Sequence, residues 1–191
     1  MNPRADASNL SNQFLIAMPG SGDSPFAGSV VYLCEHTARG ALGLVINRPT
    51  DIQLKELLDR IGLQSQIDAA GERPVWYGGP VQTERGFVLH EASPSSYAST
   101  LQVPGGLQMT TSKDVLEQIA QGLGPQRYFV ALGYAGWSSG QLEEEIAHNG
   151  WLTVEADPAI VFELAPEQRL DAALSLMGIS SLSLSQTAGH A

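Results

Sequence analysis

The chain has 191 residues, 43% of them hydrophobic, and it carries 10 Lys and Arg residues against 20 Asp and Glu residues. This length and hydrophobic content suit one globular domain. The formal charge of −10 and the scatter of the basic residues lack the electrostatic footprint of a nucleic-acid-binding surface. We therefore do not expect the chain to bind nucleic acid directly.

The beginning of the sequence is polar and mixed in charge, without the apolar core of a secretory signal. No apolar run approaches the ~20 residues of a membrane-spanning helix. The one cysteine, Cys34, excludes an intramolecular disulfide. We expect a cytoplasmic protein without membrane contact, in which residues 1–8 form a disordered lead and residues 9–191 form a single domain.

Apolar, β-prone runs alternate with amphipathic segments along the chain, which is typical of an α/β protein. The strands are predicted at residues 14–18, 29–33, 42–46, 75–77, 86–90, 107–109, 128–132, 151–155 and 160–163. Two helices are predicted to begin at capping boxes, one from Thr50 to Gln53 and one from Thr111 to Asp114. A last helix is expected to begin at Pro166 and to end at Gly178.

The segment 128–146 predicts a strand, a special turn at Gly133–Trp137 and an acidic helix. A glycine-rich turn before a helix can hold a phosphate group. Here the glycines fit neither common phosphate-binding spacing, and Glu143, Glu144 and Glu145 would repel an anion. We favour a tight turn around a packed Trp137 over a ligand loop.

Cys34 and His36 flank Glu35 at a predicted strand end, and His90 supplies a further imidazole. These groups suggest a nucleophile or a metal site, and Cys34, His36 and His90 form the candidate reactive set. A lone cysteine is more often a buried core residue, however, and the histidines lack a recognised ligand spacing. We predict no metal ligands, no cofactor and no assigned catalytic residue.

Asn47 and Arg48 follow the β-prone run 42–46 and precede Pro49. Strand ends of open α/β sheets often line ligand crevices, so Arg48 could hold a ligand. A turn is required at this place in any case, with Asn47 bonding to nearby backbone. Both interpretations stay open, with the turn favoured.

Eight segments in order resemble the AlgH/YqgE family over almost the whole chain: NQFLIAMP, SVVYLCEH, GLVINRP, YGGPV, RGFVLH, TTSKDVLE, GYAGW with GQLEEEI, and WLT. The resemblance implies a single-domain, two-layer α/β sandwich whose strongly bent mixed sheet forms a partial barrel. It also implies a binding surface made of Asn47, Arg48, Gly78, Gly79, Tyr134, Gly136 and Trp137. Because these residues lie near predicted strand ends, we expect them on one side of the fold.

Three functions are consistent with these features. The first is a non-catalytic accessory or regulatory protein that acts through an unknown protein partner or a small ligand. The second is direct DNA binding, which the family's transcriptional-regulator label suggests and which the acidic charge opposes. The third is a hydrolase or transferase that uses Cys34, His36 or His90.

Overall fold

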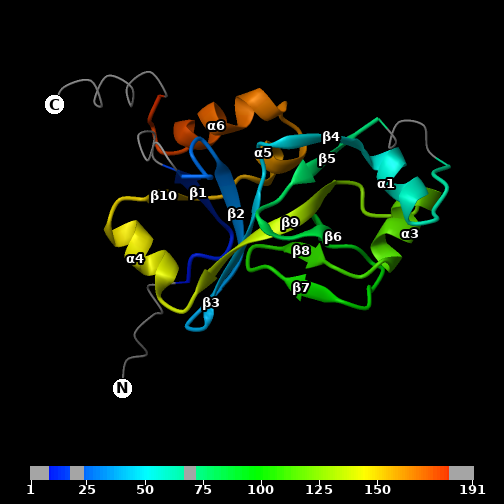
Figure 1. Ribbon diagram of the computed structural model, residues 1–191, viewed down its shortest axis with the longest axis horizontal. Coiled ribbons are helices and arrows are strands. Elements are labelled where there is room, and N and C mark those ends of the chain that lie inside the picture. The colour runs from blue at the N-terminus through cyan, green and yellow to red at the C-terminus, as the bar shows by residue number, and fades with distance from the viewer. Residues whose placement is uncertain (1–8, 18–23, 67–71, 181–191) are drawn as a thin grey trace.

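The computed structural model describes residues 9–17, 24–66 and 72–180, so the predicted disordered lead at 1–8 lies outside the described residues. Within them, ten strands form one curled sheet and five helices pack around it (Figure 1). The strands are β1 (Gln13–Ala17), β2 (Val30–Thr37), β3 (Gly40–Val45), β4 (Pro49–Gln53), β5 (Pro74–Tyr77), β6 (Val81–Glu91), β7 (Thr100–Gln102), β8 (Leu107–Thr110), β9 (Tyr128–Ser138) and β10 (Trp151–Glu155). The helices are α1 (Leu54–Arg60), α3 (Asp114–Gln121), α4 (Gln141–Ala147), α5 (Pro158–Phe162) and α6 (Pro166–Ser175).

The main path through the sheet runs β10, β1, β2, β3, β9, β6, β8, β7, and β5 joins it beside β9. All neighbours are antiparallel except β5 and β9, which makes the sheet mixed. The long strand β9 pairs with β5 and β6 along its first half and with β3 along its second half. The predicted strongly bent mixed sheet, closing toward a partial barrel with helices packed against it, is confirmed.

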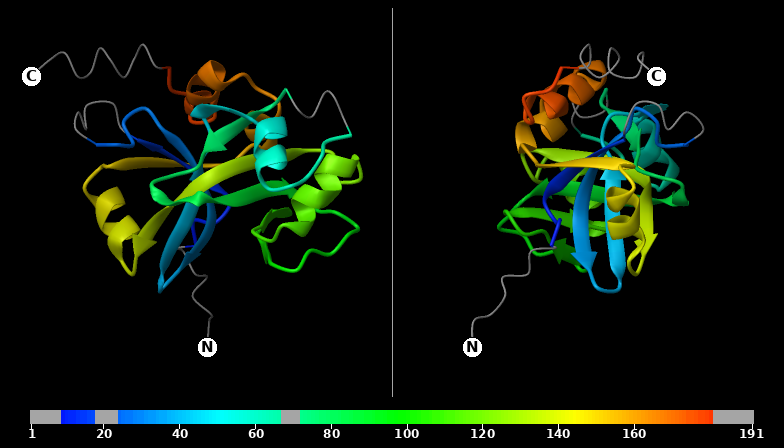
Figure 2. Two further views of the ribbon diagram at one scale, coloured as in Figure 1. Left: turned by 45° about the vertical axis from the view of Figure 1, so that its right-hand side comes forward. Right: turned by 90° about the vertical axis from the view of Figure 1, so that its left-hand side faces the viewer.

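Strands β1 and β2 are buried on both faces, which explains why their sequences are nearly continuous apolar runs. Alternate side chains point to opposite faces of a strand, so Phe14 faces a core cluster that α6 completes and Leu15 faces a cluster that α4 completes. Figure 2 shows α4 and α6 on different sides of these strands. A third cluster lies beneath α1 and α3.

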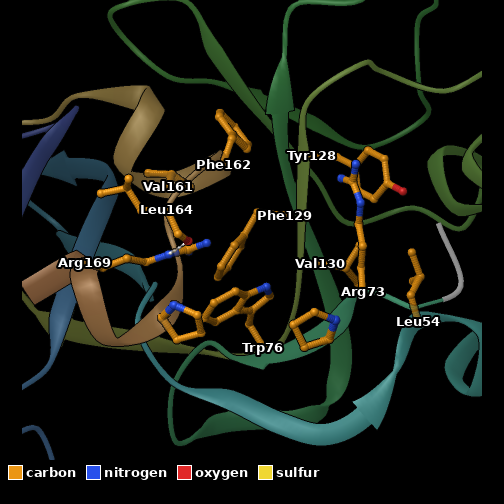
Figure 3. Close-up of a pocket in the computed structure, with 12 residues that line it drawn as sticks. Leu54, Arg73, Trp76, Tyr128, Phe129, Val130, Val161, Phe162, Leu164 and Arg169 are labelled. Carbon is orange, nitrogen blue, oxygen red and sulfur yellow. Dashed lines mark hydrogen bonds between the residues drawn. The ribbon is translucent and has the colours of Figure 1, made fainter. Parts of the chain in front are cut away.

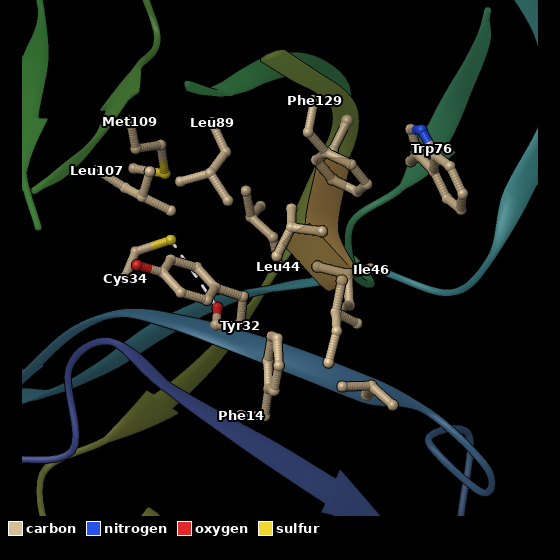
Figure 4. Close-up of a cluster of buried hydrophobic side chains, with 14 of the residues drawn as sticks. Phe14, Tyr32, Cys34, Leu44, Ile46, Trp76, Leu89, Leu107, Met109 and Phe129 are labelled. Atoms are coloured by element: carbon tan, nitrogen blue, oxygen red, sulfur yellow. Dashed lines mark hydrogen bonds between the residues drawn. The ribbon is translucent and has the colours of Figure 1, made fainter. Parts of the chain in front are cut away.

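The core cluster that α6 completes contains aromatic and aliphatic side chains from seven strands and from α5 and α6 (Figure 4). Phe14 and Tyr32 meet edge to face, and the Tyr32 hydroxyl donates to the side chain of Asn12 at 2.8 Å. Trp76 stacks on Phe129 with ring centroids 5.1 Å apart. This stacked pair extends to the wall of a surface pocket described below.

Both predicted capping boxes are wrong. Residues 49–53 form strand β4, and the Thr50 hydroxyl donates to the Val75 carbonyl of β5 instead of capping a helix. Helix α3 begins at Asp114 after Lys113, without a side-chain cap. The backbone groups near Thr50 are satisfied by pairing with a neighbouring strand instead of by a helix cap. A capping-box motif contains only local residues, so it cannot predict this long-range pairing.

Two further predictions about single elements are also wrong. The segment Gly133–Trp137 is not a turn, because β9 continues through it to Ser138 and pairs there with β3. Residues 160–163 were expected to form a strand, yet α5 covers Pro158–Phe162, with the Asp157 side chain accepting the Ala159 amide at its start. The other predicted strands have counterparts, and residues 29–33 and 42–46 lie largely in the paired strands β2 and β3.

Candidate functional site

Three glycines let two backbone segments cross at a distance that no side chain would permit. A Cβ atom on Gly78 would lie 2.2 Å from the Gly133 carbonyl oxygen, and one on Gly79 would lie 2.1 Å from the Tyr134 carbonyl carbon. Gly133 has φ +77°, which L side chains rarely adopt. All three glycines therefore stand at close backbone approaches, and Gly79 and Gly133 also have positive φ. Gly136 differs, because its nearest neighbour is only the Tyr134 side chain.

The crossing places Tyr134 beside an open groove of about 400 Å³ on the face of β2, β3 and β9. Tyr134 is half-buried against Phe87, with the ring centroids 5.2 Å apart. Val81, which is 36% exposed, pairs with Tyr134 across the strands. The exposed side chain of Arg39 lines the groove from the turn between β2 and β3. We call this the Tyr134 groove; it is lined by Glu35, Thr37, Arg39, Gly40, Ala41, Leu42, Val81, Tyr134, Gly136 and Trp137.

Trp137 is largely a structural residue, since only 6% of it is exposed. Its ring stacks on Phe26 and meets Trp151 edge to face. The carboxylate of Glu145 accepts hydrogen bonds from both indole nitrogens, at 2.9 Å from Trp137 and 2.8 Å from Trp151. Trp137 therefore borders the Tyr134 groove, but its indole nitrogen is already hydrogen-bonded to Glu145 of α4.

The side chains of Asn47 and Arg48 hold the turn at residues 24–28 in place by hydrogen bonds. The Asn47 side chain accepts the Val30 amide and donates to the Gly28 carbonyl. Arg48 donates from Nη1 to the Pro25 carbonyl at 2.8 Å and from Nη2 to the Ala27 carbonyl at 3.0 Å. The structure thus brings Gly78 and Gly79 to Tyr134, whereas the Arg48 guanidinium is directed to the turn that carries Phe26.

In the described part of the chain, Cys34, His36 and His90 form no hydrogen bonds to one another. Cys34 lies in the core near Leu107 and Met109 (Figure 4), and burial raises the pKa of its thiol. A raised pKa suppresses the thiolate that a nucleophile requires.

Both histidines are buried and engaged. The Leu10 amide donates to Nδ1 of His36, so Nε2 carries the proton and donates to Glu143 at 2.6 Å. For His90, Nδ1 donates to the Glu91 carbonyl and Nε2 accepts the Thr110 hydroxyl, and burial lowers its pKa. These bonds give each imidazole a structural role in the fold.

Cys34 is expected to behave as a core residue in a direct test. Cys34→Ala removes one buried sulfur and should lower the unfolding free energy by about 1–2 kcal/mol, within the range for small core deletions. In the native wild-type protein, a neutral-pH thiol probe should react much more slowly with Cys34 than with a free cysteine. Reaction as fast as a free cysteine or faster would show an accessible, stabilised thiolate and would contradict this placement.

No group of three or more His, Cys, Asp or Glu side chains within the described ranges could hold a metal ion. In the same part of the chain, none of the helices has the length and apolar character needed to cross a membrane.

A pocket of about 330 Å³ that no sequence pattern indicated lies between β5, β9 and the α5–α6 segment (Figure 3). Arg169 of α6 lines this pocket and is buried, with an exposed fraction of only 4%. Its Nε donates to the Leu164 carbonyl at 3.0 Å, its Nη1 donates to the Ile46 carbonyl at 2.7 Å, and its guanidinium carbon lies 4.0 Å above the Trp76 ring. We call this the Arg169 pocket; it is lined by Leu54, Arg73, Pro74, Trp76, Tyr128, Phe129, Val130, Val161, Phe162, Leu164, Pro166 and Arg169.

Arg169 has no carboxylate partner among the described residues. Burial lowers its pKa to about 10, so the guanidinium still carries its charge at neutral pH. Removing such a cation from water costs several kcal/mol when no counter-ion is present. One sequence signal could have revealed the site: Arg169 stands four residues before Ala173 on the buried stripe of α6, where a charge is unexpected.

These features define a class of mixed α/β protein with a curled half-barrel sheet, a glycine crossing beside an open groove and a buried arginine in a second pocket. The chain belongs to the AlgH-like family, whose model matches residues 14–182. The chain is 65% identical over 183 residues to a UPF0301 protein of Ralstonia pickettii, covering 96% of each chain. A UPF0301 protein of Paraburkholderia phymatum is 64% identical over 186 residues, covering 97% of each.

Two solved structures resemble the fold. The solution structure of the AlgH protein from Pseudomonas aeruginosa has a TM-score of 0.80 at 48% identity, and the match covers 100% of both chains. Protein DIP2367 from Corynebacterium diphtheriae has a TM-score of 0.68 at 16% identity, covering 91% of this chain and 88% of that one. The second likeness concerns the fold alone.

Proposed function

We propose that this AlgH-like chain is a non-catalytic, cytoplasmic accessory or regulatory protein that acts by binding a protein partner in the Tyr134 groove. The observation that carries the proposal is the combination of a half-buried tyrosine, an exposed valine and an exposed arginine around one open concavity. Tyrosine and arginine are the residue types that dominate binding energy at protein interfaces.

The rigidity of the groove also supports this proposal. Tyr134 follows directly after the glycine crossing, and Val81 is held in register with it by β6 and β9. Anchor residues on paired strands lose little conformational freedom when a partner binds, so more of the contact energy contributes to affinity. The structural roles of Cys34, His36 and His90 agree with a function that needs no reacting group from these three side chains.

The groove can be tested with a double variant, Arg39→Ala with Val81→Ser, because both side chains are exposed and their loss should leave the fold intact. We expect a partner that wild-type protein captures to be lost or bound at least about tenfold more weakly, as for removal of interface anchors. Arg60→Ala, an exposed arginine paired with Glu56 on α1, is the matched control and should retain the partner. Equal capture by the double variant would contradict the groove assignment.

The same preparation separates this function from direct DNA binding. With a net charge of −10, the protein should bind duplex DNA at physiological salt no tighter than the non-specific range of about 10⁻⁴ to 10⁻⁶ M. A sequence-specific mobility shift at nanomolar protein would favour the DNA-binding alternative.

A further inference from the structure

We propose that the Arg169 pocket binds a small organic oxyanion, a carboxylate or a phosphate ester carried on a flat apolar body. The pocket holds a buried cation that no acidic side chain of the described chain neutralises, beside two stacked aromatic rings. This site is separate from the Tyr134 groove, because the two concavities share no lining residue.

The guanidinium is fixed in direction before any ligand arrives. Two of its nitrogens are held by the Leu164 and Ile46 carbonyls, and its plane lies over Trp76. Nη2 has no hydrogen-bond partner in the described chain. It is not fully buried either, because Ser29 Oγ is the one fully buried side-chain nitrogen or oxygen atom without a partner among the described residues. A donor with free N–H groups therefore stands at the pocket, and an oxyanion matches it in charge and geometry.

The walls around this donor suit the body of the ligand. Trp76 and Phe129 stack at 5.1 Å, and Val161, Phe162 and Leu164 complete an apolar side (Figure 3). Small-molecule pockets commonly combine such apolar walls with a few polar groups that fix orientation. A flat apolar group can lie against these side chains while its oxyanion meets Arg169.

A second cation, Arg73, adds to the positive charge of the pocket lining. Arg73 lies on the side opposite Arg169 in Figure 3, with its guanidinium carbon 4.7 Å from the Tyr128 ring centre. No Asp or Glu lines the pocket. Against a net charge of −10 for the whole chain, two arginines without a lining acid make a local site that favours anions.

Titration calorimetry of the full chain with three probes tests the proposal. Benzoate and phenyl phosphate carry the two forms of oxyanion on the same ring, and benzamide is the neutral counterpart of benzoate. We expect at least one of the two anions to bind about tenfold or more tightly than benzamide, as for a hydrogen bond to a charged group. The better of the two identifies the carboxylate or the phosphate as the preferred group.

Two charge-reversal variants assign the binding to this pocket. Arg73→Glu should weaken binding of the preferred anion by about fivefold or more, because it replaces a cation of the pocket lining by an acid. Arg85→Glu changes the net charge equally and also removes an arginine from above an aromatic ring, that of Phe87, so it is the matched control and should leave binding unchanged. Arg169→Met, where circular dichroism shows it to be folded, should abolish the preference for the anions over benzamide.

The result that would overturn the proposal is equally definite. Benzoate, phenyl phosphate and benzamide binding within about twofold of one another would show that charge is not recognised. The absence of heat from both anions up to about 10 mM would have the same meaning. Equal weakening by Arg73→Glu and Arg85→Glu would place any anion binding outside the Arg169 pocket. None of these readouts depends on the protein partner of the Tyr134 groove.

Discussion

Replacing Gly79 by alanine is expected to lower the unfolding free energy by about 3 kcal/mol or more, which is a large fraction of the stability of an ordinary domain. The new Cβ would lie 2.1 Å from the carbonyl carbon and 2.2 Å from the carbonyl oxygen of Tyr134. Both are backbone atoms of β9, which is held by β6 and by β3 and cannot move as a flexible side chain can. Urea unfolding followed by circular dichroism measures the loss.

Two glycines with open surroundings serve as controls for this prediction. Gly86→Ala in β6 meets no atom within 4 Å and should change the unfolding free energy by less than about 1 kcal/mol. Gly28→Ala also meets no atom within 4 Å, but its φ of +73° should cost about 1–2 kcal/mol. If Gly79→Ala were no worse than Gly28→Ala, the backbone crossing would not be a tight structural constraint.

The titration of Cys34, Tyr32 and Arg169 is expected to lower the unfolding free energy of the protein by about 3 kcal/mol between pH 9 and pH 11. Burial raises the folded-state pKa of both Cys34 and Tyr32, so the unfolded chain loses these protons first. Their contribution to stability is complete below pH 9 and falls by about 1.4 kcal/mol per pH unit for each group above its unfolded pKa. Over this window the titration of Cys34 removes about 3 kcal/mol, and that of Tyr32, which starts near pH 10, removes about 1 kcal/mol.

Arg169 acts in the opposite direction and is included in that total. Its folded pKa of about 10 lies below that of the unfolded chain, so deprotonation relieves the buried charge and returns about 1 kcal/mol between pH 10 and pH 11. Urea unfolding at pH 8, 9, 10 and 11 measures the profile. The Cys34→Ala variant should lose about 3 kcal/mol less than wild type over the window. Parallel profiles for the two proteins would show that Cys34 is not the titrating group.

The sequence by itself was sufficient wherever a local pattern has one structural solution. The β-branched runs around Val31 and Leu44 became the antiparallel pair β2 and β3, because the short segment between them leaves little alternative. Pro166 begins α6 as its fixed φ favours at the first helical turn. Gly78, Gly79 and Gly133 each follow or interrupt a β-prone run, and each stands where a Cβ atom would meet backbone.

Tertiary contacts decided the elements and the site that the local pattern described wrongly. Gly133 can sit in a turn or bend a strand, and only the pairing of residues 135–138 with β3 keeps β9 extended. Thr50 can cap a helix or bond to a strand, and Val75, 25 residues away, takes its hydroxyl. The Arg169 pocket depends on carbonyls of Ile46 and Leu164 and on the rings of Trp76 and Phe129, which are brought together from four separate parts of the chain. The sequence shows that residue 169 is an arginine. It does not show that this arginine is buried without a counter-ion, because that burial exists only after these distant segments have packed.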